Sequence, residues 1–140
     1  MKKLLCLSFL LLSNCGEEPF LIDGIYKVDI NFVRSDWQIL DGIDEEKLPV
    51  QWYIEETKDG WHYEVVGGST QCEGIRKDNK IIFYKENKNT PGFVDGTFEL
   101  IVIPNKDGDK FKGTGRIESL IGEATFITEI THKGKLISGE

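Results

Sequence analysis

The sequence predicts an all-β fold, an eight-stranded antiparallel up-and-down barrel that follows an N-terminal signal segment. Apolar and polar residues alternate with period two from residue 24 onward, turn-forming residues separate the alternating runs, and most connections between runs are short. Such alternation places successive side chains on opposite faces of a sheet. Short connections favour a meander over a sandwich, because a sandwich needs long crossings between its sheets. Closure of the meander also removes exposed sheet edges.

The first fifteen residues have the organisation of an export signal that ends in a lipid-attachment site. Two lysines precede an apolar run over residues 4–12, which is too short to cross a bilayer because a span needs about 20 apolar residues. Leu12-Ser13-Asn14-Cys15 follows, and with this box the chain resembles bacterial lipoprotein precursors. The resemblance implies that a signal peptide of residues 1–14 is removed and that Cys15 becomes the first residue, with diacylglycerol on its sulfur and usually an N-linked acyl chain such as palmitate. An ordinary secretory signal, with an incidental thiol at Cys15, is the alternative.

The resemblance also gives the expected domain plan and location. Residues 15–23 are expected to form the lipidated N-terminus and a tether, and residues 24–140 a single barrel domain. Gly16 follows the cysteine, whereas an acidic residue there retains enterobacterial lipoproteins in the inner membrane. We therefore expect attachment to the cell envelope through the lipid, at the outer membrane. The sequence does not decide between the periplasmic and the surface face of that membrane.

Composition limits the partners of the exported chain. Loss of residues 1–14 leaves 15 basic and 24 acidic residues and changes the formal charge from −7 to −9. An acidic body repels phosphate backbones and anionic head groups, so nucleic acid is not expected as a partner, and membrane attachment is expected from the lipid rather than from a basic face. Only Cys72 would keep a free thiol, so no internal disulfide is expected. An inward position would make Cys72 a small buried apolar side chain.

Eight strands are expected after residue 24. The first three have apolar phases at Tyr26, Val28, Ile30 and Phe32, at Val50, Trp52 and Ile54, and at Trp61, Tyr63 and Val65. Further strands are expected over residues 69–75, 80–85, 97–103, 110–118 and 123–132. Residues that tolerate positive φ mark hairpins at 58–60, 67–68, 77–79 and 107–109. The two longer connections are residues 34–47 and 86–95.

Three features resemble the lipocalin-like group of small eight-stranded meander barrels. Gly24-Ile25-Tyr26 opens the first strand, as a Gly-x-Trp does in that group. A long first loop follows, and Phe111-Lys112-Gly113-Thr114-Gly115 lies on a late strand. The resemblance implies a barrel that is open at one end and that sometimes holds a small apolar ligand beneath the first loop.

The aromatic side chains in the apolar phase are expected inside the barrel. They are Trp52, Trp61, Tyr63, Phe83, Phe98, Phe111 and Phe126. An eight-stranded barrel is just wide enough either to be filled by side chains or to hold one small ligand. Gly113, Gly115 and Ala124 project little inward, so they would either open a pocket or make room for large rings. The sequence leaves both alternatives open.

The binding candidates follow from this interior and from the first long loop. Trp37 lies in the loop of residues 35–48, which would either plug one end of the barrel or cover a ligand. We therefore name Trp37, Trp52 and Tyr63 as candidate ligand-binding residues of a membrane-anchored lipoprotein that binds a small apolar ligand. The alternative is a packed barrel that binds a protein partner through exterior loops such as residues 87–95.

No motif in the sequence indicates an enzyme, a cofactor or a metal site. His62 and His132 are both assigned to the polar, solvated phase of their strands. Asn105, Asp107 and Asp109 imitate the opening of a calcium loop, but the glycine at the sixth position and the glutamate at the twelfth are missing. The strand-to-helix Gly-x-Ser-x-Gly turn of serine hydrolases is also missing. No catalytic residue is therefore assigned.

Overall fold

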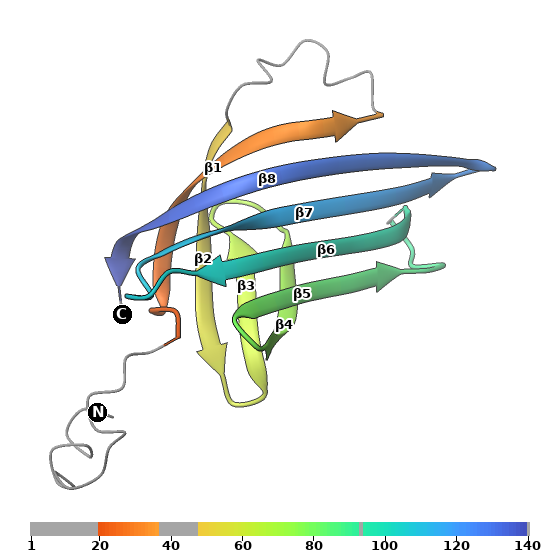
Figure 1. The fold of residues 1–140 in the computed structure, drawn as a ribbon. Helices are drawn as coiled ribbons and strands as arrows, with labels where there is room; N and C mark the ends of the chain where they lie inside the picture. Colours follow the sequence, from red (N-terminus) through yellow and green to blue (C-terminus); the bar gives the residue numbers. More distant parts are fainter. Residues whose placement is uncertain (1–19, 37–47, 93, 140) are drawn as a thin grey trace, which may run out of the picture.

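The computed structural model describes residues 20–36, 48–92 and 94–139. It shows a closed barrel in which eight antiparallel strands follow one another in chain order (Figure 1). The strands are β1 (Gly24–Ser35), β2 (Leu48–Thr57), β3 (Gly60–Val65), β4 (Gln71–Lys77), β5 (Lys80–Asn87), β6 (Asp95–Pro104), β7 (Lys110–Ile121) and β8 (Ala124–Gly139). The predicted all-β up-and-down barrel is therefore confirmed. The predicted signal segment and Cys15 lie outside the described residues.

The barrel closes because β8 returns to pair with β1. Their register runs from Gly24 opposite Gly139 to Ser35 opposite Thr128, with a bulge on either side of the central stretch. The predicted last strand stopped at residue 132, whereas β8 continues to Gly139. The extension keeps the same alternation, because Gly134 is buried and Leu136 half-buried, while Lys133 and Lys135 in the other phase are exposed. Without it, the first half of β1 would lack a partner on this side.

The hairpin turns lie where the turn residues predicted them. Asp78, between β4 and β5, adopts a φ of 58°, and Gly108, between β6 and β7, a φ of 73°. Only glycine and a few short polar residues adopt such left-handed angles at low cost. The longest hairpin joins β7 and β8, and Figure 1 shows that it extends beyond the end of β1. Ala124 is exposed in this hairpin, so it does not shape the interior as the sequence interpretation proposed.

The residues just before β1 close one end of the barrel. Leu21 is 1% exposed, and the Phe20 ring packs edge-on against Trp61 with 6.3 Å between centroids. The Ile22 amide donates a 2.9 Å hydrogen bond to the Gly108 carbonyl. Residues 20–23 are therefore part of the folded domain, although they precede the predicted start at residue 24. We call residues 20–23 the N-terminal segment and this end the packed end.

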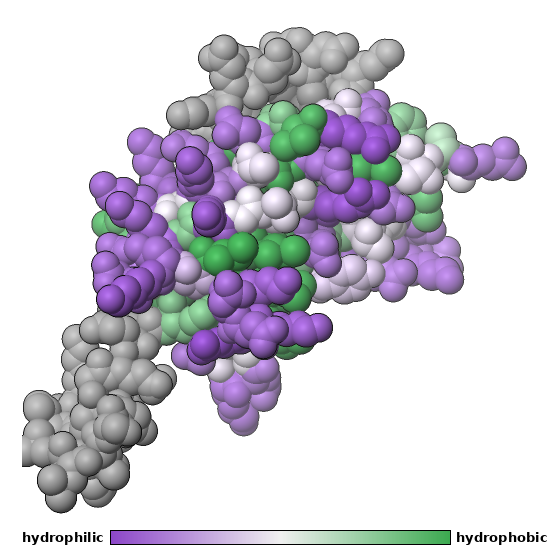
Figure 2. All heavy atoms as spheres, in the orientation of Figure 1, coloured by the Kyte–Doolittle hydropathy of each residue, from purple (hydrophilic) through white to green (hydrophobic). Residues whose placement is uncertain are grey.

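The interior between the two ends is apolar and mostly aromatic. The fully buried apolar residues include Tyr26, Val28, Trp52, Ile54, Trp61, Tyr63, Cys72, Ile81, Phe83, Leu100, Val102 and Phe111. Cys72 is thus buried as its inward position predicted, and burial raises the pKa of its thiol. Phe98 and Phe126 are only half-buried. Hydrophilic side chains cover much of the outer wall seen in Figure 2, with smaller apolar areas between them.

His132 corrects the sequence interpretation, which placed it on the solvated face. Its side chain is 2% exposed, and its ring packs edge-on against Trp52 and Phe111 at 5.1 and 5.5 Å between centroids. The Nε2 atom lies 2.9 Å from the Ile101 carbonyl oxygen and donates to it, whereas Nδ1 has no hydrogen-bond partner among the described residues. The physical reason is the phase of β8, in which even-numbered residues such as Ile130 point inward.

Candidate functional site

A cavity of about 240 Å³ opens inside the barrel at the end opposite the N-terminal segment. Most of its lining is apolar or aromatic, and in this part the polar groups are the Trp52 indole and the Tyr63 phenol. The eleven residues concerned are Ile30, Phe32, Val50, Trp52, Tyr63, Val65, Phe98, Leu100, Gly115, Ile117 and Ile130. Thr70, Arg116 and Thr128 complete the lining. We call this space the barrel cavity and this end the cavity end.

Trp52 and Tyr63, two of the predicted binding residues, form the boundary between the cavity and the packed core. Their rings meet edge-on at 5.0 Å between centroids. Trp52 also stacks on Phe111 of the packed core at 5.8 Å, and Tyr63 packs against Phe83 at 5.5 Å. The core therefore fixes the orientation of both rings. The structure brings Trp52 and Tyr63 together as cavity residues, whereas Trp37 lies outside the described residues.

The two inward glycines on β7 have different roles. A Cβ atom at Gly113 would lie 1.9 Å from the Ile101 carbonyl oxygen, so Gly113 permits the close approach of β6 and β7. A Cβ atom at Gly115 would lie 2.9 Å from Ile130 and 3.3 Å from Leu100. Gly115 thus lets these two side chains pack closely while it forms part of the cavity wall. Gly115 therefore makes room for neighbouring side chains and also lines the cavity, whereas Gly113 serves the approach of two backbones.

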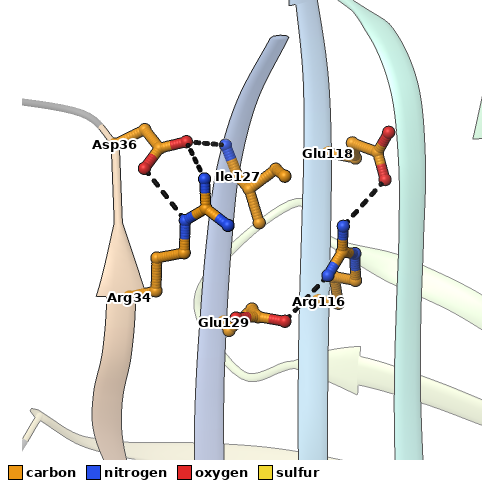
Figure 3. A network of polar contacts seen from close by, with 6 residues as sticks. All are labelled: Arg34, Asp36, Arg116, Glu118, Ile127 and Glu129. Atoms are coloured by element: carbon orange, nitrogen blue, oxygen red, sulfur yellow. Dashed lines mark hydrogen bonds and ion pairs between the residues drawn. The ribbon is translucent and has the colours of Figure 1, made fainter.

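The cavity wall offers little charge to a ligand. Burial raises the pKa of the Tyr63 phenol above its ordinary value, so Tyr63 stays neutral at any physiological pH. Arg116 is the single charged residue among the described residues that line the cavity. Its guanidinium nitrogens lie 2.8 Å from Glu129 and 3.4 Å from Glu118, and Figure 3 shows all three side chains on the outer wall of β7 and β8. The interior of the cavity is therefore apolar and uncharged.

A second polar cluster fixes the end of β1 at the rim of the cavity (Figure 3). Arg34 donates two hydrogen bonds of 3.1 Å to the Asp36 carboxylate, and Asp36 Oδ2 accepts a 2.9 Å bond from the Ile127 amide of β8. The Arg34 hydrogen bonds, and then the Ile127 amide, lower the pKa of Asp36. The sequence reasoning missed this cluster, although Arg34 and Asp36 are two residues apart and so lie on one face of a strand.

The remaining chemical groups do not assemble a reactive site among the described residues. His62 lies on the outer face of β3, where the hydrogen bond that its Nδ1 donates to the Glu73 carboxylate, together with nearby Glu64, raises its pKa. Within the described ranges, no group of three or more histidine, cysteine, aspartate or glutamate side chains is placed to hold a metal ion. The barrel cavity is thus the candidate site that the described structure offers for a ligand.

No protein-family model matches this chain, and comparisons with curated proteins and with solved structures give no significant match. In residues 20–36, 48–92 and 94–139, no helix has the length and apolar character that crossing a membrane requires. The assignment of the barrel cavity as a candidate site therefore rests on the structure of this chain alone.

Proposed function

We propose that the protein is an exported lipoprotein that is attached to the cell envelope through acyl chains on Cys15 and that binds a small apolar ligand in its barrel cavity. The observation that carries the binding proposal is the apolar cavity of about 240 Å³ at one end of the barrel. An engineered apolar cavity of about 150 Å³ in another protein stays dry and binds benzene. The barrel cavity can therefore hold one substituted ring or a short branched chain, which supports ligand binding over a fully packed barrel.

The polarity of the lining defines the class of ligand. A charged group placed against the apolar wall would lose its hydration without gaining a partner. Arg116, the one cation among the described residues that line the cavity, is already paired with two glutamates on the outer wall. A neutral ligand is therefore favoured over a fatty acid or another organic anion.

The position of the N-terminal segment supports an anchor remote from the cavity. Ile22 is fixed at the packed end by its bond to Gly108, and Cys15 precedes it by seven residues. Even fully extended, seven residues span at most about 25 Å. Acyl chains on Cys15 would therefore hold the packed end close to the bilayer and leave the cavity end able to take ligand from the aqueous side.

The anchor is tested by mass spectrometry of the N-terminal peptide and by fractionation. We expect a mature chain that begins at Cys15 with covalent acyl chains, since two or more chains give stable anchoring. A Cys15→Ser variant should leave the detergent-soluble membrane fraction, while a Cys72→Ser variant, which keeps Cys15, should remain there. An unmodified Cys15 in the purified native protein would disprove the lipid anchor.

Ligand binding is tested by titrating the protein with toluene, a neutral ring of suitable size, and following the methyl resonances of Ile30 and Ile130. We expect a Kd of about 1 mM or tighter, which corresponds to roughly 4 kcal/mol. Ile30→Phe places extra volume in the cavity and should weaken binding at least tenfold. Ile75→Phe makes the same change at a side chain that is 60% exposed on the outer wall, so it should leave the Kd unchanged.

A second variant separates cavity loss from poor folding. Phe98 lines the cavity and stacks on Tyr63 at 6.1 Å between centroids. Phe98→Ala enlarges the cavity, so it should allow a larger neutral probe, naphthalene, to bind more tightly than it binds to the parent. Equal changes in the Kd for toluene in Ile30→Phe and Ile75→Phe, or no toluene binding by the folded parent, would contradict the proposal.

A further inference from the structure

Five lysines lie together on the outer wall of the barrel near the packed end. They are Lys27 of β1, Lys110 and Lys112 of β7, and Lys133 and Lys135 of β8. Strand register places Lys135 opposite both Lys27 and Lys110, and Lys133 opposite Lys112. All five line one shallow depression, in which Asp29 is the single acidic residue. We call this surface the lysine face, and hydrophilic side chains cover the corresponding ends of β7 and β8 in Figure 2.

Among the described residues, the lysine face keeps an excess of positive charge, because five lysines line it against Asp29, which lies opposite Lys133. In the described part of the chain, the ion pairs involve Arg34, His62 and Arg116, which lie outside the lysine face, and none joins its five amines to a carboxylate. Like charges directly opposite each other on neighbouring strands destabilise a sheet. Such a cluster is also unexpected for a chain that carries 24 acidic residues. The barrel thus keeps a local positive surface that its own fold does not need.

We propose that the lysine face binds the anionic phospholipid head groups of the bilayer, an inference that rests on the proposed lipid anchor at Cys15. The first argument is position. The Ile22 amide is bonded to Gly108, two residues before Lys110, so the N-terminal segment leaves the barrel beside the lysine face, and Figure 1 shows this segment at the same end as the start of β7 and the end of β8. The tether then keeps Ile22 within about 25 Å of the acylated residue, so the adjoining lysine face stays near the bilayer.

The second argument is charge complementarity. Attraction between exposed charges falls off over a Debye length of about 8 Å at physiological ionic strength, so only the surface that touches the head groups is attracted. The acidic remainder of the barrel would be repelled. The lysine face therefore sets the orientation of the barrel, with the wall formed by β1, β7 and β8 against the bilayer. This proposal differs from the expectation from composition, in which the lipid alone provides membrane contact.

The test uses the exported chain, residues 15–140, with Cys15→Ser, so that binding is measured without acyl chains and without the apolar signal segment. Vesicles of phosphatidylcholine, with and without phosphatidylglycerol, are sedimented with the protein at low and high salt. The variant Lys112→Gln/Lys133→Gln/Lys135→Gln removes three charges from the lysine face. The matched control Lys58→Gln/Lys77→Gln/Lys88→Gln removes three exposed charges that lie outside it.

We expect binding that requires phosphatidylglycerol and that high salt abolishes. Each lysine near an anionic surface contributes about fivefold in affinity, so the lysine-face variant should bind roughly 100-fold more weakly, and the control at most a few-fold more weakly.

Equal losses of vesicle affinity in the two variants, or no preference for phosphatidylglycerol, would overturn the proposal. Tight binding of free inorganic phosphate without vesicle binding would assign the face to a soluble anion and would also overturn it. Because this protein carries no acyl chain, the outcome is independent of whether Cys15 is lipidated, which mass spectrometry decides separately.

Discussion

The two ends of the barrel are built from the same eight strands but are filled differently. At the packed end, Leu21 enters the interior, and the Tyr26 and Phe111 rings meet at 5.0 Å between centroids. At the cavity end, the described side chains leave about 240 Å³ unfilled, and Ile117 on the wall is 43% exposed. Leu21 of the N-terminal segment adds to the aromatic packing at one end, whereas at the other end the described side chains leave space. A short terminal segment can thus help to fill one end of a meander barrel.

This difference separates stability from binding along the barrel axis. Close packing contributes most where buried side chains have partners on all sides. A binding site needs unfilled space, since a pocket is apolar surface that no side chain of the protein covers. We therefore expect substitutions at the packed end to change the free energy of unfolding and substitutions at the cavity end to change ligand affinity.

The largest expected effect is at Leu21. Leu21→Ala removes a fully buried side chain and should lower the free energy of unfolding by about 4 kcal/mol, within the usual range for such deletions. Ile117→Ala, at the cavity end, should lower it by less than about 1 kcal/mol because that side chain is already partly solvated. Urea unfolding followed by tryptophan fluorescence measures both. Similar losses in the two variants would show that the ends are equally important for stability.

His132 tests the layer between the two ends, because it contacts both Trp52 and Phe111. Burial lowers its pKa from 6.5 to about 4, so in the folded protein the ring stays neutral over that interval while the unfolded chain takes up a proton. The free energy of unfolding therefore has its full value above pH 6.5 and decreases as the pH falls toward 4, by up to about 3 kcal/mol. His132→Gln should remove this part of the pH dependence.

Two observations control the His132 prediction. His62→Gln should act in the opposite direction, because a raised pKa contributes stability at low pH that is lost as the pH rises through the folded value. In the parent protein, NMR signals of the His132 ring should not titrate above pH 5. If His132→Gln and the parent lose the same stability between pH 6.5 and 4, the buried ring is not the cause.

The strands and their inward residues could be predicted from the sequence because they depend on local alternation. Trp52 and Tyr63 were placed inside the barrel on that basis, and the structure agrees. The cavity could not be predicted, because it depends on how side chains from several strands fill a shared volume. Gly115 illustrates this, since its effect on the cavity depends on Ile130 and Leu100, which come from neighbouring strands.

The features that the sequence reasoning missed had weak but readable signals. His132 shares the phase of Ile130, although the lysine next to it suggested a solvated stretch. Lys110 and Lys112, like Lys133 and Lys135, are two residues apart, which places each pair on one face. Their convergence depends on the register of β1, β7 and β8, which alternation within single strands does not determine.

The smallest expected effect concerns how the N-terminal segment is held at the packed end. The Tyr26 hydroxyl lies within hydrogen-bond distance of the Ile22 and Gly108 carbonyl oxygens and can donate to either. Burial, and then the nearby carboxylates of Asp23 and Asp109, raise the pKa of this phenol, so it remains a donor. Tyr26→Phe should lower the free energy of unfolding by about 1 to 2 kcal/mol and should speed hydrogen exchange at the Ile22 amide, which bonds to Gly108.

Tyr84→Phe is the control, because it removes a hydroxyl from a half-exposed ring on the outer wall and should change neither the free energy of unfolding nor the exchange rate. If Ile22 exchange is unaffected in Tyr26→Phe, then Leu21 burial alone retains the segment, and the packed end depends on apolar contacts rather than on this polar link.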